Sequence, residues 1–120
     1  MREADFQTRL KRLLEGIGAL VFNVHGHAMQ SIGWPDLYVA HWKWSGWLEL
    51  KVDHEPLREV QRIVLRELSK RRVPCFVLRL HVEEAMMDIV EINERGNHGK
   101  TWMVDWHETC KDPMSLLGNL

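Results

Sequence analysis

The order of helical and strand periodicities along residues 1–80 limits the folds open to this chain. Segments 2–16 and 56–72 carry apolar side chains at intervals of three and four, which is typical of amphipathic helices. Four shorter segments have the alternating or continuously apolar pattern of strands: 21–24, 37–42, 47–52 and 74–80. A turn signal at Ser45 and Gly46 joins the second and third of them into a hairpin. The pattern predicts an α/β fold with a mixed sheet flanked by helices, in the order α-β-β-β-α-β.

The last third of the chain has weaker patterns. They indicate, in order, a helix that passes into a strand, a turn, a further strand and a closing helical turn: 83–93, 93–99, 101–106 and 112–120. No repeat, low-complexity stretch or linker divides the 120 residues, so we expect a single domain.

Composition restricts the class of protein. Of the 120 residues, 45% are apolar and 28% are charged, as in soluble globular proteins. No apolar run approaches the ~20 residues of a membrane span, and charged residues open the chain where a signal peptide would be apolar. Cys75 and Cys110 have neither the number of a disulfide framework nor the spacing of a zinc site. We therefore expect a cytoplasmic protein that does not contact a membrane.

The charges are nearly balanced, with 16 Lys and Arg against 17 Asp and Glu, for a net charge of −1 with neutral histidines. This balance argues against a protein that coats nucleic acid by bulk electrostatics. It leaves open an enzyme that needs carboxylates for a metal ion beside cations for phosphate, so the distribution of the charges decides.

The strands of the predicted hairpin carry acidic and basic residues that share one face. Alternation places Trp47, Glu49 and Lys51 on the same side of their strand. Glu49 and Lys51 then lie only ~7 Å apart, at about 3.4 Å per residue. The hairpin brings Asp36, thirteen residues before Glu49, alongside them. A Glu-x-Lys strand or an Asp after a proline is common by itself, whereas the joint arrangement is much rarer.

Each predicted helix has a polar residue in its apolar stripe. Glu3 lies seven residues before Leu10, within the stripe of the first helix. It could equally be a carboxylate that favours a helix N-terminus because of the macrodipole. Gln61 lies in the stripe of the second helix, where it is either a functional amide or a hydrogen-bonded core group.

Three arginines recur every four residues along one flank of the second helix: Arg58, Arg62 and Arg66. They could form a row of phosphate contacts. They could also form an ordinary solvated face, with Glu59 and Glu67 as their partners.

Metal-assisted hydrolysis of a phosphodiester is the chemistry that the hairpin residues could perform. Mg²⁺ prefers oxygen ligands and often takes only one or two protein carboxylates. Asp36 and Glu49 could supply these, with the Leu50 backbone carbonyl as a third oxygen. Lys51 could polarise the attacking water or hold the phosphate.

These residues resemble the signature of the PD-(D/E)XK nucleases, in which Pro-Asp and Glu-x-Lys flank a hairpin. The Pro35-Asp36 pair, the E-L-K run at 49–51, Glu3 and Gln61 stand in the order of that pattern. The S-x-G-x-P-D-L run at 31–37 looks most like the VRR-NUC branch, the virus-type replication-repair nucleases, to which Holliday junction resolvases are related. The resemblance covers residues 3–80, so these would be the core of the domain and 81–120 a C-terminal extension.

The resemblance implies a restriction-endonuclease-like core and an endonuclease that depends on Mg²⁺ or Mn²⁺, without a small-molecule cofactor. Asp36 and Glu49 would be metal ligands and Lys51 the catalytic lysine. Glu3 would complete or orient the metal site, and Gln61 would position Lys51 or water. Ser31 would contact DNA from the loop before Asp36, a weaker match.

The family also implies a homodimer that cleaves branched DNA such as Holliday junctions, in DNA repair, with a phage origin and hence a host cytoplasm. Two other readings stay open: a restriction-like or flap-directed nuclease, and a non-catalytic DNA-binding module with the same fold. Three tryptophans around the predicted turn, Trp42, Trp44 and Trp47, are unusual for the family. We expect some of them to form the dimer contact, or to stack on an unpaired base.

Overall fold

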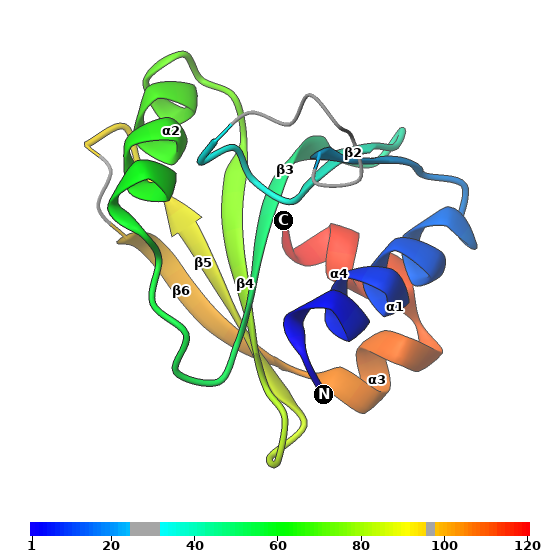
Figure 1. Cartoon of the computed structure of the whole chain (residues 1–120). Coiled ribbons are helices and arrows are strands. Elements are labelled where there is room, and N and C mark those ends of the chain that lie inside the picture. Colours follow the sequence, from blue (N-terminus) through cyan, green and yellow to red (C-terminus); the bar gives the residue numbers. More distant parts are fainter. Residues whose placement is uncertain (25–31, 96–97) are drawn as a thin grey trace.

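A single mixed sheet organises the chain, and helices cover both of its faces (Figure 1). The computed structural model describes residues 1–24, 32–95 and 98–120. Within them the elements follow in this order: α1 (Glu3–Glu15), β1 (Leu20–Asn23), β2 (Leu37–Ala40), β3 (Ser45–Val52), α2 (Glu59–Lys70), β4 (Cys75–His81), β5 (Met86–Ile92), β6 (His98–Asp105), α3 (Trp106–Lys111) and α4 (Pro113–Asn119). The predicted α/β class and the order α-β-β-β-α-β over the first part of the chain are confirmed.

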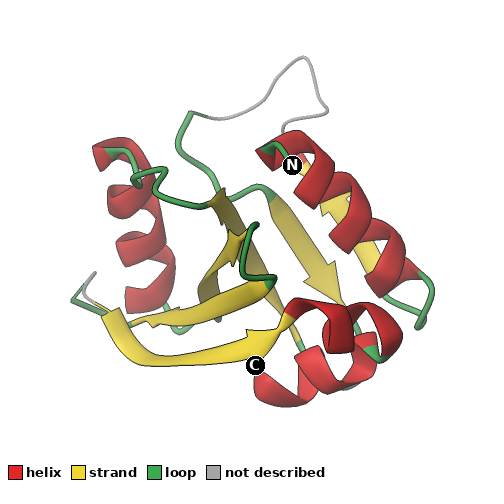
Figure 2. Cartoon of the chain, turned by 90° about the horizontal axis from the view of Figure 1, so that it is seen from below, coloured by secondary structure: helices red, strands yellow, loops and turns green. Residues whose placement is uncertain are grey.

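The six strands lie in the sheet in their sequence order, from β1 to β6. The β3–β4 pair is parallel and the other pairs are antiparallel, so the sheet is mixed, as predicted. The helix α2 connects the two parallel strands and lies on one face, while α1, α3 and α4 lie on the other (Figures 1 and 2). In the described part of the chain, no helix has the length and apolarity to cross a bilayer.

The alternation of β3 separates two apolar clusters. On the face of α1, the helix side chains Phe6, Leu10 and Leu14 pack with strand residues that include Leu48 and Leu50. On the face of α2, a smaller cluster gathers around a few buried side chains: Leu65, Cys75, Val77 and Ile92. Trp47 packs against this second cluster, so Glu49 and Lys51, which alternate with Leu48 and Leu50, share the face of α2.

The predicted hairpin turn was misplaced. Ser45 and Gly46 belong to β3, and the chain reverses at His41–Trp44, where the His41 backbone N–H donates to the Trp44 carbonyl over 3.1 Å. The Ser45 hydroxyl donates to the His41 carbonyl and accepts from the His41 N–H, which explains why a serine follows the turn.

The helix predicted within 83–93 is also wrong. Met86–Ile92 is a strand, β5, which pairs with β4 along its length. Helix-favouring Glu and Ala lie in the preceding turn, where Ala85 has a positive φ of 53°. Pairing with both neighbouring strands overrides the local helix propensity of this segment. The sequence reading also missed α3, whose N-cap Asp105 accepts a hydrogen bond from Glu108 N.

Candidate functional site

Strand register brings the two acids of the hairpin together. Leu37 of β2 is paired with Leu48 of β3, so the preceding Asp36 lies opposite the following Glu49. The Asp36 carboxylate oxygen Oδ2 accepts a hydrogen bond of 2.8 Å from the Leu50 backbone N–H. The N–H and C=O of one strand residue face the same neighbour, so the Leu50 carbonyl is directed to the side of Asp36 as well.

A third carboxylate joins them from the first turn of α1. Oxygen atoms of Glu3, Asp36 and Glu49 all lie within 4.8 Å of one another. Asp36 and Glu49 are 2% and 0% exposed, and the neighbouring Lys51 is 5% exposed. Glu3 is half-buried at the end of the stripe that Phe6 continues into the core, so its predicted place on the inner face of α1 is confirmed.

Burial sets the protonation of two of these acids. The pKa of Glu49 is raised to about 10, chiefly by desolvation, then by the Asp36 carboxyl as hydrogen-bond partner and as negative charge, while Lys51 lowers it. The pKa of Glu3 is raised to about 7, first by desolvation and then by a hydrogen bond with Glu55. No described N–H or hydroxyl group donates to either buried oxygen of Glu49.

The chemistry of this donor set fits a divalent cation. Two buried oxygens without a protein donor are costly for a carboxylate. An ion that takes oxygen ligands would supply that missing partner and would restore the charged forms of Glu3 and Glu49. Among the described residues, the candidate ligands are these three carboxylates and the Leu50 carbonyl.

An open cleft of about 470 Å³ reaches Glu3 and Asp36, while Glu49 is not among its lining residues. Its lining residues come from α1, the end of β3 and the start of α2: Glu3, Gln7, Asp36, Lys51, Glu55, Pro56, Arg58 and Gln61. Lys51 also lines the cleft, and its positive charge favours the charged forms of Glu49 and Glu3.

Gln61 performs a structural task as well as lining the cleft. Its side-chain oxygen Oε1 accepts a hydrogen bond of 2.9 Å from the Arg58 backbone N–H and so caps α2. The side chain is only 4% exposed. The carbonyl half of the amide is thus used by the helix, and only the NH₂ half remains for the cleft.

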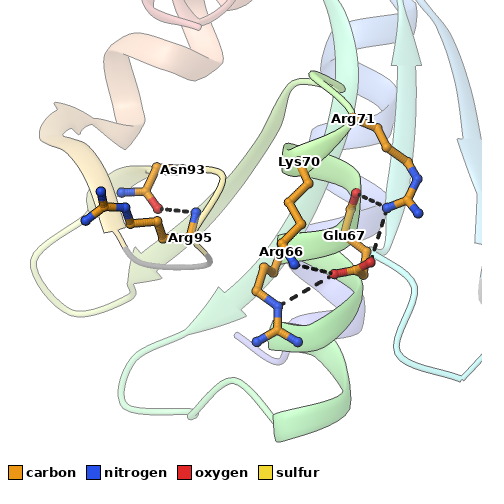
Figure 3. Close-up of polar contacts among 6 residues, drawn as sticks. All are labelled: Arg66, Glu67, Lys70, Arg71, Asn93 and Arg95. Atoms are coloured by element: carbon orange, nitrogen blue, oxygen red, sulfur yellow. Dashed lines mark hydrogen bonds and ion pairs between the residues drawn. The ribbon is translucent and has the colours of Figure 1, made fainter.

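The three arginines of the predicted row have different surroundings. Arg58 is exposed and lines the cleft, and Arg62 is exposed on the next turn of α2. Arg66 Nε lies 3.7 Å from the carboxylate of Glu67, which also pairs with Lys70 and Arg71 (Figure 3). Hydrogen bonds from Lys70 and Arg71 lower the pKa of the Glu67 carboxyl. Arg58 therefore lies at the cleft, whereas Arg66 belongs to an ion-pair cluster.

Of the predicted site residues, Glu3, Asp36, Glu49, Lys51, Arg58 and Gln61 surround one place. Arg66 lies apart from them, and Ser31 lies outside the described residues. Sequence reasoning missed Glu55, which lines the cleft and forms a hydrogen bond with Glu3. Its position just after the strand of Glu49 and Lys51 is the only signal that pointed to it.

The tryptophans around the hairpin turn differ in exposure. Trp42 is 90% exposed. Trp44 is half-buried against Phe76, with ring centroids 5.8 Å apart. Trp47 is half-buried between Trp34 and Tyr38, at centroid distances of 5.3 and 5.0 Å. Trp42 is thus the member of this group that is open to a partner.

Comparison with known proteins assigns this chain to no family. No protein-family model matches the sequence, and no curated protein is significantly similar to it.

Proposed function

We propose that this protein is a metal-dependent DNA endonuclease with a restriction-endonuclease-like core, related to the VRR-NUC nucleases. The observation that carries the proposal is the buried Glu49 carboxylate, which receives no hydrogen bond from a described N–H group and which faces Asp36 and Glu3 beside Lys51. Structural ion pairs do not explain three converging carboxylates with a single ammonium group, because burial penalises each negative charge.

Asp36, Glu49 and the Leu50 carbonyl would hold Mg²⁺ or Mn²⁺, with Glu3 as a further ligand or as the group that orients the site. The ion supplies a lowered pKa for a ligated water and charge stabilisation at the scissile phosphate. Asp36 keeps the hairpin strands in register at this point, because its carboxylate also accepts from Leu50 N.

Lys51 would bind a phosphate oxygen or orient the attacking water from its place in the cleft. The NH₂ group of Gln61 is a further donor that lines the cleft, since the carbonyl oxygen caps α2. Arg58 and Arg62 would contact phosphates next to the scissile one. Contacts of this kind give affinity that falls steeply with salt and carries little base specificity.

We further propose a homodimer that acts on branched DNA. Two copies related by a two-fold axis present two cleavage sites to the two-fold symmetry of a four-way junction. Exposed Trp42 supports a contact between copies, because aromatic residues are enriched in such contacts.

The test is cleavage of a four-way junction, a flap, a splayed arm and a linear duplex, with and without Mg²⁺. We expect metal-dependent cleavage that favours the junction. Glu49→Ala and Lys51→Ala should each lower the single-turnover rate by about 10²-fold or more while DNA is still bound.

Glu84→Ala is the matched control, since Glu84 is exposed in the turn between β4 and β5 and far from the cleft in sequence. Preference for the linear duplex or the flap would replace junction cleavage by a restriction-like or flap-directed activity. Equal DNA binding by wild type and Glu49→Ala, with no cleavage by either, would leave a binding module.

A further inference from the structure

An arginine interrupts the apolar strand β4 directly beside the candidate catalytic lysine. Arg79 is the register partner of Lys51 in the parallel β3–β4 pair, so both side chains leave the same face of the sheet. The neighbouring residues Leu78 and Leu80 point into the opposite core. A cation at this position needs a partner, and α2 does not supply one.

The partner of Arg79 is the loop between β3 and α2. Its Nη1 donates to the carbonyl oxygen of Asp53 over 2.8 Å and also to that of Glu55. One guanidinium nitrogen thus holds two carbonyls that are two residues apart. Within this loop Asp53 has a φ of 50°, in the left-handed region that Asp adopts more readily than most residues with a β-carbon.

Two more hydrogen bonds fasten the same turn to β4 and the residue that follows it. The Asp53 N–H donates to the Leu80 carbonyl over 2.8 Å, and the Asp53 carboxylate accepts from Val82 N over 3.0 Å. Arg79 is the only side chain among the described residues that ties the Glu55 carbonyl to the sheet.

This loop forms one rim of the cleft. Glu55 is exposed, yet it lines the cleft together with Glu3. Its carboxylate also accepts from Val52 N over 3.3 Å. The loop leads into Arg58, whose backbone N–H donates to Gln61. Because no core packing holds Glu55, its position depends on the backbone of the loop.

We propose that Arg79 is a positioning residue: it anchors the β3–α2 loop to β4 and thereby places Glu55 at the rim of the cleft that Glu3 and Arg58 also line. This inference rests on the proposed function, since it assigns Arg79 to the support of the metal site. Groups that support metal ligands from outside typically change metal affinity or activity by about 10- to 100-fold when they are removed.

The experiment compares Arg79→Gln and Arg79→Lys with Arg71→Gln. Arg71 is a matched control, because it also donates to a backbone carbonyl, that of Glu67, but within α2. Amide hydrogen exchange at Asp53 and Glu55, Mn²⁺ affinity without DNA by calorimetry, and single-turnover cleavage are measured on each folded variant. Glu55→Gln changes a cleft-lining side chain and leaves the hydrogen bonds from Arg79 to the loop backbone in place.

We expect Arg79→Gln to speed exchange at both amides about 10-fold and to weaken Mn²⁺ binding and kcat/KM by about 10-fold. Arg79→Lys should show smaller changes in amide exchange, Mn²⁺ binding and kcat/KM, since one ammonium group can still reach one carbonyl. Arg71→Gln should leave all three unchanged, and Glu55→Gln should weaken Mn²⁺ binding with normal exchange.

If amide hydrogen exchange at Asp53 and Glu55 were unchanged in Arg79→Gln, the proposal that Arg79 anchors the loop would be wrong. Faster exchange with wild-type Mn²⁺ affinity and cleavage would overturn the positioning role, as would wild-type behaviour of Glu55→Gln. If the wild type cleaves no DNA, the proposed nuclease function fails, and exchange and Mn²⁺ affinity alone decide whether Arg79 supports a metal site.

Discussion

At the scale of single residues, Glu49 carries the greatest energetic conflict in the protein that the structure describes. It occupies a strand position between Leu48 and Leu50, is fully buried, and receives no hydrogen bond from a described N–H group. A carboxylate in such a place destabilises the fold in its charged form. The proposed function rests on Glu49 because a bound divalent cation would offset this cost.

The pKa of Glu49 predicts how the metal-free protein responds to pH. The value is raised from 4.5 to about 10 in the folded state, so the folded protein holds a proton that the unfolded chain releases. The free energy of unfolding should therefore fall as pH rises from about 4.5 towards 10. Glu49→Gln, which stays neutral, should be more stable than wild type by about 1–3 kcal/mol near pH 8 in EDTA.

Urea unfolding at about pH 5 and about pH 8 measures this difference, with Glu84→Gln as a control of equal charge. Added Mn²⁺ should stabilise the wild type more at the higher pH, because the ion binds deprotonated carboxylates. A wild-type stability that rises with pH in EDTA, to the same extent as that of Glu49→Gln, would contradict the assignment.

At the scale of elements, α2 links two strands of the sheet and contributes residues to the candidate site. It connects the parallel strands β3 and β4, and its first turn presents Arg58 and Gln61 to the cleft. Its last turns carry the ion-pair cluster around Glu67 (Figure 3), and no member of that cluster lines the cleft. The start of the helix is thus the part that would bear on the proposed chemistry.

Variants of Gln61 separate capping from chemistry. Gln61→Ala removes the acceptor of Arg58 N, so we expect a loss of about 0.5–2 kcal/mol in the free energy of unfolding together with slower cleavage. Gln61→Glu keeps an acceptor at this capping position, so it should remain close to wild-type stability. It loses the NH₂ donor and adds a negative charge to the cleft, and cleavage should fall by about 10-fold or more.

Urea unfolding and single-turnover rates on the same preparations give the two quantities. If Gln61→Glu cleaved as fast as wild type, the amide would have no part in the chemistry, and its role would be that of a helix cap.

At the scale of the whole molecule, the sheet faces differ in what covers them. Three helices cover one face, and α2 covers part of the other (Figures 1 and 2). Two large apolar side chains remain exposed at the start of β1 and in the neighbouring β2–β3 turn: Leu20 and Trp42, at 77% and 90%. This surface is where the proposed contact between two copies would be made.

Two tryptophan variants test the dimer. Trp42→Ala should lower the sedimentation mass from dimer towards monomer while the free energy of unfolding per chain changes little. Trp44→Ala should cost about 2 kcal/mol instead, because Trp44 packs against Phe76. A monomeric wild type would contradict the dimer, and an unchanged mass of Trp42→Ala would place the contact elsewhere.

The sequence by itself determined the elements of the first eighty residues and the meeting of Asp36 with Glu49 and Lys51. Periodicity and hairpin formation are local properties, so neighbouring residues suffice to predict them. The inward place of Glu3 followed from the same periodicity of α1.

Only the tertiary structure showed which polar side chains line the cleft and which hold other parts of the chain in place. Gln61 caps α2 and Arg66 pairs with Glu67 through local contacts, whereas Arg79 holds the β3–α2 loop through carbonyls 24 and 26 residues away in the chain. Met86–Ile92 became a strand because β4 and β6 were there to pair with it. Such outcomes depend on contacts between segments far apart in the chain, which no local pattern encodes.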